Sequence, residues 1–329
     1  MIEIVTTGAL ATVQDRGRDG ALKWGVGSSG ALDDLALAAG NILLGNDEDA
    51  AGIEIQIFPF QARFTADCVF AITGADCAAT LDDLPLPPWW RQTAKAGQIL
   101  NLGLPRQGAW SASRAYLCLG GGVDVPQVLG SRSTQMRGAF GGLDGRALRS
   151  GDRLRAGPAN NATKHVSFGL SPPALDLPLM AGDLPAVRVL PAAEYDQYTE
   201  AAHHALWNDV WRVTPQSNRY GYRLEGTPLL PVTPIETRSH GIVPGVIQVP
   251  PNGQPIVQMR DAQPSGGYPK IGVVIAADLW RLGQAPIGSR IRFIRTSWDD
   301  AIAAGEQTAR WLAEARRLVD LHCGWTRSH

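Results

Sequence analysis

Ile53-Glu54-Ile55-Gln56-Ile57 alternates strictly between apolar and polar side chains, and this stretch decides the class of fold. A period of two is typical of a β-strand with one buried face. Val69-Phe70-Ala71-Ile72-Thr73 is continuously apolar, which predicts a strand buried on both faces. Residues 99–102 and 115–119 are further short runs, and turn clusters such as Gly120-Gly121-Gly122 separate them. The first half of the chain is therefore predicted to consist mainly of strands.

The composition supports a globular chain with many turns. Among the 329 residues are 37 glycines and 23 prolines, an excess typical of many short strands joined by turns. Apolar residues make up 44% and charged residues 19%, as expected for a folded domain. The formal net charge is only -1, which argues against a surface built to bind nucleic acid or an anionic membrane.

The sequence favours a cytoplasmic location. No stretch approaches the roughly 18 apolar residues that a membrane helix needs. The start, Met1-Ile2-Glu3-Ile4-Val5-Thr6, lacks the basic region and apolar run of a signal peptide. The cysteines, Cys68, Cys77, Cys118 and Cys323, have no C-x-x-C spacing and are expected to be buried thiols in a reducing compartment.

Three helices are predicted among the strands. Asp33 is a typical N-cap residue, apolar residues follow it at helical spacing, and Gly45 ends the helix. A second helix is expected over about 194–208. The third begins at the capping box Ser297-Trp298-Asp299-Asp300 and keeps its helical spacing to Val319.

A weak internal repeat predicts two β units. A glycine turn, a polar residue and a strand recur at 97–100, 151–154 and 288–291. We expect a first unit over 1–158, a connection rich in Pro, Ala and Asp to about 191, and a second unit over 192–329 that includes the C-terminal helix. The expected fold is mainly β, with two barrel-like or sandwich units and a few peripheral helices.

The common catalytic motifs are absent from the sequence. It has no G-x-x-x-x-G-K-[ST] phosphate loop, no G-x-G-x-x-G after a strand, no H-E-x-x-H and no G-x-S-x-G. The six histidines have no metal-ligand spacing, and His203-His204 would point in different directions on a helix. No metal site is therefore predicted.

Glycine-rich polar loops are the candidate sites in the first half. Residues 25–34 precede a helix and could hold a carboxylate or phosphate, or form an ordinary capped loop. Asp76 follows a buried strand and could act as a base or orient an amide, or simply bond its own backbone. Ser131 and Arg132 lie in Gly130-Ser131-Arg132-Ser133-Thr134, which offers hydroxyls and a guanidinium to an anion, or forms a polar turn.

The second half carries the densest cluster of polar residues. Asn218 and Arg219 stand in a polar stretch, Gln248 interrupts an apolar strand, and Asp261 ends another. Gly266-Gly267-Tyr268 adds two flexible donors and an aromatic hydroxyl. Polar groups in apolar strands are costly unless they are satisfied or used. We therefore interpret this cluster as functional rather than structural.

The same stretches carry a family resemblance. They are Thr12-Val13-Gln14-Asp15-Arg16-Gly17-Arg18, Ser29-Gly30-Ala31-Leu32-Asp33, Gly74-Ala75-Asp76, Gly130-Ser131-Arg132-Ser133-Thr134 and Pro244-Gly245-Val246-Ile247-Gln248-Val249-Pro250. They resemble the allophanate hydrolase subunit 2 family, also called the Kip antagonist family or the family of the 5-oxoprolinase C subunit. Residues 261–269 resemble its D-x-x-T-x-G-G-Y-P signature, with Pro264 in place of Thr.

The resemblance implies cyclophilin-like β-barrel units and a leading function. The chain would be the C subunit of an ATP-dependent 5-oxoprolinase that opens the lactam amide of 5-oxoproline. Its partners would be a Kip inhibitor-like B subunit and a hydrolytic A subunit, with ATP bound by the partner or shared with it. Asp261, Asp76, Asn218 and Gln248 would position the amide. Substrate binding would involve Arg219, which would meet the carboxylate, together with Gly266, Gly267, Tyr268, Ser131 and Arg132.

Two alternative functions are compatible with the same fold and the same partner protein. The chain could be the carboxyltransferase component of a biotin-dependent urea or amide carboxylase. It has no E-A-M-K-M segment, so the biotin would be carried by a separate protein. It could also be a regulatory protein that binds a Kip inhibitor-like partner.

Overall fold

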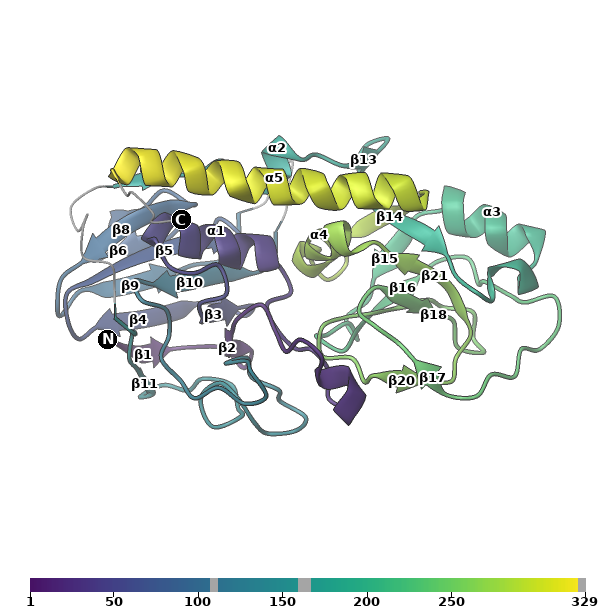
Figure 1. Ribbon diagram of the computed structural model, residues 1–329, viewed down its shortest axis with the longest axis horizontal. Coiled ribbons are helices and arrows are strands. Elements are labelled where there is room, and N and C mark those ends of the chain that lie inside the picture. Colours follow the sequence, from purple (N-terminus) through teal and green to yellow (C-terminus); the bar gives the residue numbers. More distant parts are fainter. Residues whose placement is uncertain (107–111, 159–166, 325–329) are drawn as a thin grey trace. The chain divides into compact units, whose positions relative to one another are not determined.

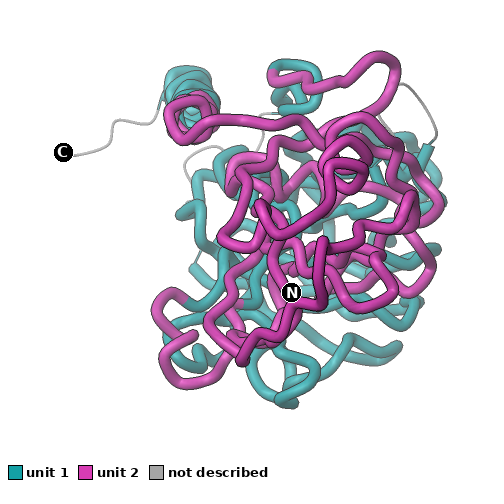
Figure 2. Tube along the Cα trace, turned by 90° about the vertical axis from the view of Figure 1, so that its right-hand side faces the viewer, with its two compact units in different colours: residues 1–18, 29–176, 309–329 teal, residues 19–28, 177–308 magenta. Residues whose placement is uncertain are grey.

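The computed structural model describes residues 1–106, 112–158 and 167–324. The chain forms two compact units (Figure 1, Figure 2): the first contains residues 1–18, 29–176 and 309–329, the second 19–28 and 177–308. Both consist mainly of strands with few helices, which confirms the predicted class. Residues 159–166, in the expected connection, lie outside the described residues. The domain limits expected from the sequence stay a prediction.

Two six-stranded antiparallel sheets make up the first unit (Figure 1). One has the order β11 (Arg153–Leu154), β1 (Ile2–Thr6), β4 (Phe60–Phe64), β9 (Ile99–Leu102), β6 (Thr80–Leu81) and β7 (Leu84–Pro85). The other has the order β12 (Phe168–Gly169), β8 (Trp90–Ala94), β5 (Cys68–Gly74), β10 (Ala115–Leu119), β3 (Gly52–Ile55) and β2 (Ala11–Gln14).

One apolar core joins the two sheets. Alternate residues such as Ile2 and Ile4 of β1 and Ile72 of β5 contribute to it. The rings of Phe64 and Phe70, one from each sheet, lie 4.9 Å apart. This packing follows from the strand period of two, which places every second side chain between the sheets.

Helix α1 (Asp34–Leu44) covers the opposite face of the second sheet. Asp33 caps it by accepting the Ala36 N–H at 2.9 Å, and Gly45, with φ of 72°, ends it, as the sequence predicts. Gly40 permits the close approach, because a Cβ there would lie 2.6 Å from the Sγ of Cys118. The helix therefore buries the face of β5 and β10 that points away from the core.

This helix overturns one prediction, that the alternating stretch at 53–57 is a half-exposed strand. All four residues of β3 are buried, and Glu54 is 1% exposed. Glu54 accepts the Leu32 N–H at 2.8 Å and the Tyr116 hydroxyl at 2.7 Å. The Arg114 guanidinium lies 3.8 Å away. The polar face is buried because the helix and its preceding loop cover it and supply its hydrogen bonds.

The second unit contains a closed seven-stranded barrel. Its order is β14 (Leu184–Pro191), β21 (Lys270–Val274), β18 (Val246–Gln248), β19 (Ile256–Gln258), β16 (Gly221–Glu225), β15 (Trp211–Val213) and β22 (Arg290–Arg295). β22 pairs with β14 in parallel and closes the ring. β13 (Met180–Ala181) pairs antiparallel with β14, and β17 (His240–Gly241) pairs with β20 (Ser265–Gly266).

Ring closure distinguishes the two units. In the described part of the first unit no strand pairing joins the two sheets, so they remain open. Three of the four sheet edges there, β7, β11 and β12, are strands of only two residues. Such short edges offer few backbone groups for further pairing. The barrel expected from the sequence is therefore found in the second unit, whereas the first is a pair of open sheets around one core.

The helices of the described chain are few. Besides α1 they are η1 (Ala21–Trp24), α2 (Pro173–Asp176), η3 (Tyr195–Gln197), α3 (Glu200–Asn208), η4 (Ala276–Asp278), α4 (Leu279–Gln284) and α5 (Trp298–Cys323). α5 begins with the predicted capping box, since Ser297 Oγ accepts the Asp300 N–H at 3.1 Å and donates to its carboxylate at 2.7 Å. None of the helices within 1–106, 112–158 and 167–324 is long and apolar enough to cross a membrane.

The prediction of one continuous helix over 194–208 is wrong in its first turns. A 3-10 turn comes first, and α3 begins only after Thr199. Thr199 is extended and caps α3 by accepting the Ala202 N–H at 3.1 Å. Its own N–H donates to the carbonyl of Leu230. A threonine that bonds in this way favours a helix start over a helix interior.

Cys77 and Cys118 are buried thiols, and burial raises the pKa of each to about 12. At pH 8 only about 1 in 10,000 of either side chain would be the reactive thiolate. We expect both to resist alkylation in the native protein and to react fully in urea, as measured by mass spectrometry of labelled peptides. Rapid native labelling of Cys118 would contradict its burial beneath α1.

Candidate functional site

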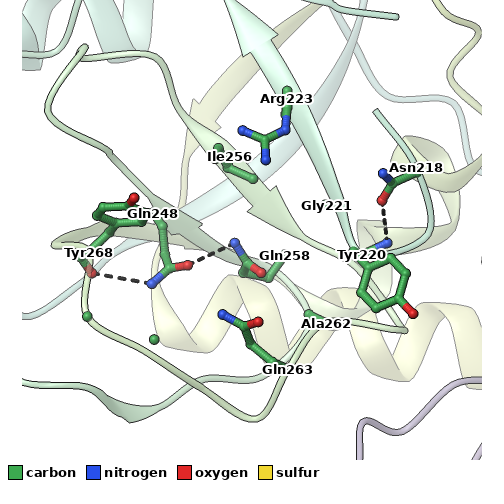
Figure 3. A pocket seen from close by; sticks show the side chains of 12 residues that line it. Asn218, Tyr220, Gly221, Arg223, Gln248, Ile256, Gln258, Ala262, Gln263 and Tyr268 are labelled. Carbon is green, nitrogen blue, oxygen red and sulfur yellow. Dashed lines mark hydrogen bonds between the residues drawn. The ribbon is translucent and has the colours of Figure 1, made fainter. Parts of the chain in front are cut away.

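A cavity of about 490 Å³ lies on the outside of the barrel (Figure 3). Its walls come from β16, β18, β19 and the segment that leads into β21. The lining residues are Asn218, Tyr220, Gly221, Arg223, Gln248, Ile256, Gln258, Ala262, Gln263, Gly266, Gly267 and Tyr268. Five of them are site residues that the sequence predicts: Asn218, Gln248, Gly266, Gly267 and Tyr268.

Strand register brings these residues together. Arg223 of β16 lies opposite Ile256 of β19, and Ile256 in turn lies opposite Gln248 of β18. On β21, Lys270 lies opposite Gln248 beside a bulge. Side chains in such a row share one face of the sheet. It is the outer face, because the next residue on β19, Val257, is fully buried inside the barrel.

Two glutamine amides form an oriented chain in the cavity (Figure 3). Gln248 Nε2 donates to the Tyr268 carbonyl at 3.4 Å, and Gln258 Nε2 donates to Gln248 Oε1 at 2.9 Å. A peptide carbonyl only accepts hydrogen bonds, so Tyr268 fixes the orientation of Gln248, which fixes that of Gln258. No described residue donates a hydrogen bond to Gln258 Oε1. The cavity therefore offers a fixed acceptor.

A second amide is oriented as a donor. Asn218 Oδ1 accepts the backbone N–H of Tyr220 at 2.8 Å (Figure 3). Its Nδ2 therefore carries the donors that remain for a ligand, and no hydrogen bond from it to a described residue is formed. The cavity thus combines one fixed acceptor, on Gln258, with one fixed donor, on Asn218.

Lys270 anchors the loop that forms one wall. Its ammonium donates to the carbonyls of Gly266 at 3.1 Å and Tyr268 at 3.2 Å, and His240 Nδ1 lies 3.3 Å away. Burial lowers the pKa of Lys270, and the Glu194 carboxylate partly offsets this. The Lys270 backbone N–H also donates to Glu194 at 3.0 Å. These bonds hold the loop and so fix the carbonyl that orients the amide chain.

Arg219 and Asp261 pair with each other, and neither is among the residues that line the cavity. They are 7% and 2% exposed. Arg219 donates from Nε and Nη2 to the two carboxylate oxygens at 2.9 and 3.0 Å. The Asp261 N–H also donates to the Arg219 carbonyl at 2.9 Å. Their chain neighbours Tyr220 and Ala262 line the cavity, so this bidentate pair holds two of its walls.

Segment 19–28 packs against one of these walls. Ser28 Oγ donates to the Arg260 carbonyl at 3.2 Å. A Cβ at Gly27 would lie 2.7 Å from the carbonyl oxygen of Ala262. Position 27 therefore requires glycine for the close approach of two backbones.

Gly27→Ala is expected to displace the turn at Ala262, because the added methyl group has no space there. Overpacking of this kind costs about 1–3 kcal/mol. We expect a lower melting temperature for this variant. Gly305→Ala is the matched control, since a Cβ at Gly305 meets no atom within 4 Å. Equal melting temperatures for the two variants would contradict the packing argument.

The remaining predicted residues belong to the first unit and do not line this cavity. Asp76 accepts the Ala78 N–H at 3.0 Å and pairs with Arg106 at 3.1 Å. This is the arrangement of an Asp that stabilises a turn.

The loop at 130–134 does bind an anion, but that anion belongs to the chain. The buried carboxylate of Asp15 accepts the Ser131 hydroxyl at 2.7 Å, and also the Ser133 hydroxyl and the Arg132 N–H. The loop before α1 likewise binds Glu54 through the Leu32 N–H. Both loops whose residues predict anion binding are thus engaged by internal carboxylates.

Sequence reasoning missed several residues of the site, above all Gln258, which lines the cavity, and Lys270, which anchors the loop that forms one wall. Gln258 is a polar residue at the end of an apolar strand, so the rule that singles out Gln248 also applies to it. Lys270 directly follows the Gly-Gly-Tyr-Pro stretch, but its buried position has no local signal. Among the described residues no group of three or more His, Cys, Asp or Glu side chains is placed to hold a metal ion.

Comparison with known proteins agrees with the resemblance. Residues 24–295 match the family described as carboxyltransferase domain, subdomain A and B. The chain is 42% identical over 314 residues to the 5-oxoprolinase C subunit of Escherichia coli (strain K12), an alignment that covers 95% of this chain and 97% of that protein. The Haemophilus influenzae protein of the same name is 40% identical, with coverages of 97% and 99%.

Larger proteins contain a similar region. Urea amidolyase of Saccharomyces cerevisiae is 31% identical over 320 residues, which are 91% of this chain and 17% of that protein. The crystal structure of the K. lactis urea amidolyase superposes with a TM-score of 0.84 at 28% identity, over 95% of this chain and 20% of that chain. The family match and the two relatives of nearly equal length lead to one conclusion: the chain belongs to the carboxyltransferase domain family and groups there with the C subunits of 5-oxoprolinase.

Proposed function

We propose that this chain is the C subunit of an ATP-dependent 5-oxoprolinase and that its cavity binds the lactam of 5-oxoproline. The observation that carries the proposal is the oriented amide chain that ends at Gln258. A lactam is a cis amide, so its N–H donor and its carbonyl acceptor lie side by side. Gln258 Oε1 would accept the N–H, and Asn218 Nδ2 would donate to the carbonyl.

The roles of the buried pair follow from its burial. Arg219 and Asp261 act as positioning residues that hold the Tyr220 and Ala262 walls in place. A direct contact of Arg219 with the substrate carboxylate, or of Asp261 with the amide, stays a prediction. The same holds for contributions of Asp76, Ser131 and Arg132.

The other components of the enzyme are proposed from the names of the relatives. An enzyme with a C subunit also has further subunits, which we infer to be a Kip inhibitor-like B subunit and a hydrolytic A subunit. ATP would supply the energy to open a stable lactam. The four free cysteines support a reducing, cytoplasmic location. We further infer that the barrel of the second unit is cyclophilin-like.

The test is ATP hydrolysis by the assembled A, B and C subunits with and without 5-oxoproline. We expect hydrolysis that depends on 5-oxoproline and glutamate that accumulates in step with ADP. Assembly without any 5-oxoproline-dependent hydrolysis would rule out the proposed reaction.

Gln258→Leu is expected to lower kcat/KM for 5-oxoproline by about 10–100-fold, because the lactam N–H loses its acceptor. Gln197→Leu is the matched control, since Gln197 is exposed in the same unit and does not line the cavity. The melting temperature of Gln197→Leu should stay close to that of the unmodified protein, whereas that of Gln258→Leu should fall somewhat, because Gln248 Oε1 loses its donor. If the two variants had the same kcat/KM, the lactam would not bind at Gln258.

A second candidate function is carboxyl transfer to a urea-like amide. It is favoured by the family match and by the similarity to the K. lactis urea amidolyase structure. Urea also presents N–H and C=O groups side by side, so the same acceptor and donor fit it. Activity that avidin abolishes, together with a requirement for a biotinylated carrier protein, would select this reaction over lactam hydrolysis.

A further inference from the structure

A second cavity, of about 470 Å³, borders the first on the same barrel face. Its lining residues are Thr214, Gln216, Arg223, Leu224, Glu225, Gly226, Pro250, Asn252, Gln254, Pro255 and Ile256. Arg223 and Ile256 line both cavities. Because these two residues lie opposite each other on β16 and β19, one cross-strand pair forms the border between the cavities.

Arg223 is the cation at this border. Its side chain is exposed and forms no hydrogen bond or ion pair with any residue in the described part of the chain. In the view of Figure 3, Ile256 lies between Arg223 and Gln258. A guanidinium with all its donors available is suited to bind oxyanions.

Two further groups among the residues that line the second cavity have no hydrogen-bond partner in the described protein. The Thr214 hydroxyl oxygen is buried and has no hydrogen-bond partner among the described residues. Gln216 is exposed, and its side chain likewise bonds to no described residue. A buried hydroxyl without a partner is uncommon and calls for an explanation such as a ligand.

The acidic residue that lines the second cavity repels an anion only weakly. Glu225, the single carboxylate among the lining residues, is ion-paired with Arg212 on the neighbouring strand. Gln254 is also satisfied, since it accepts the Gly226 N–H at 2.9 Å and donates to the Gly226 carbonyl at 3.1 Å. The charge that remains for a ligand is the positive charge of Arg223.

We propose that the second cavity binds the phosphate oxyanions of the co-substrate, with Arg223, Gln216 and Thr214 as donors. This inference rests on the proposed function, which requires ATP, and adds where its phosphates bind. The shared wall of Arg223 and Ile256 would place a phosphate beside the lactam in the first cavity. Arg223 would hold the negative charge at that border.

The first test uses inorganic tripolyphosphate and the isolated 329-residue chain in titration calorimetry. We expect saturable binding that weakens as salt is added. Arg223→Gln should weaken it by about tenfold or more, as expected for a lost charge-assisted hydrogen bond. Arg290→Gln is the matched control: Arg290 is exposed on β22 and lines neither cavity. No binding by the unmodified chain, or equal weakening in both variants, would overturn the proposal.

Thr214→Val separates a ligand contact from a structural role. The hydroxyl has no partner in the described protein, so its replacement by a methyl group should leave the melting temperature unchanged or raise it. The same change should weaken tripolyphosphate binding severalfold. A lower melting temperature with unchanged binding would remove Thr214 from the proposed site.

The assembled enzyme distinguishes failure of this site from failure of the proposed function. Gln216→Ala and Thr214→Val should raise the KM for ATP and leave the KM for 5-oxoproline unchanged. Tripolyphosphate binding that depends on Arg223, without 5-oxoproline-dependent hydrolysis, would keep the site and reject the function. Hydrolysis with an unchanged KM for ATP in both variants would keep the function and reject the site.

Discussion

Asp261→Ala is expected to lower the free energy of unfolding by about 3–5 kcal/mol, because it leaves the Arg219 guanidinium buried without this carboxylate. Both members are almost fully buried, so solvent does not screen the loss. Activity should disappear as well, since the Tyr220 and Ala262 walls of the cavity depend on the pair. Urea unfolding followed by tryptophan fluorescence measures the change. A loss below about 1 kcal/mol would contradict the structural role of the pair.

The double variant Arg219→Met/Asp261→Leu decides what Asp261 does. Replacing a buried ion pair by apolar residues of similar size is often close to neutral for stability. If stability and activity both return, the pair only positions the walls. If stability returns and activity stays absent, Asp261 acts on the substrate, as the sequence predicts. Glu225→Ala is the control for an exposed pair: Glu225 and Arg212 are both more than half exposed, so little stability should be lost.

The fold could be predicted from the sequence where the signal was local. The continuous apolar run at 69–73 is β5, and the capping residues Asp33 and Ser297 precede α1 and α5. Closure of the barrel has no such signal. It depends on parallel pairing of 186–189 with 292–295, which are separated by the rest of the unit. Local periodicity identifies strands but does not identify the partner of each strand.

The site was predictable where polar residues interrupt apolar strands. Gln248 lines the cavity because strand register places it on the outer face of the barrel. Asn218 lines the same cavity from the segment just before β16. The mutual pairing of Arg219 and Asp261 could not be predicted, because a sequence shows two charges but not that they neutralise each other. From sequence alone, a charged residue near a site could equally well stabilise a wall of the cavity or contact the substrate.

The same limit of sequence-based prediction applies to the glycine-rich loops of the first unit. Hydroxyls and backbone N–H groups at 131–133 have the chemistry that binds an anion, and so does the start of α1. Local sequence does not reveal whether the anion is a ligand or a carboxylate of the same chain. Here Asp15 and Glu54 occupy these donors, and burial, with the nearby Glu54 and Asp33 carboxylates, raises the pKa of Tyr116 well above its ordinary value. The loop sequences therefore predict correctly that an anion is bound, but they do not identify that anion.

Asp15→Asn is expected to lower the free energy of unfolding by about 3 kcal/mol or more. The carboxylate is 3% exposed and accepts hydrogen bonds from Ser131, Arg132, Ser133 and the Gly17 N–H. An amide supplies only one acceptor oxygen, so its NH2 group would face donors, and hydrogen bonds to a charged group are each worth about 1.5–3 kcal/mol. Urea unfolding at neutral pH measures the loss, and a change below about 1 kcal/mol would show that the loop does not depend on this charge.

Asp76→Ala is the matched control for Asp15→Asn, and it also tests the catalytic role that the sequence predicts for Asp76. Asp76 lies in the same unit, but its ion pair with Arg106 is exposed, so its loss should cost under about 1 kcal/mol. As a turn residue it should leave kcat/KM for 5-oxoproline unchanged. As a catalytic base it should lower kcat by about 100-fold or more while stability stays intact. The free energy of unfolding therefore tests Asp15, which is expected to stabilise the fold. The value of kcat tests Asp76, which the sequence predicts to contact the substrate.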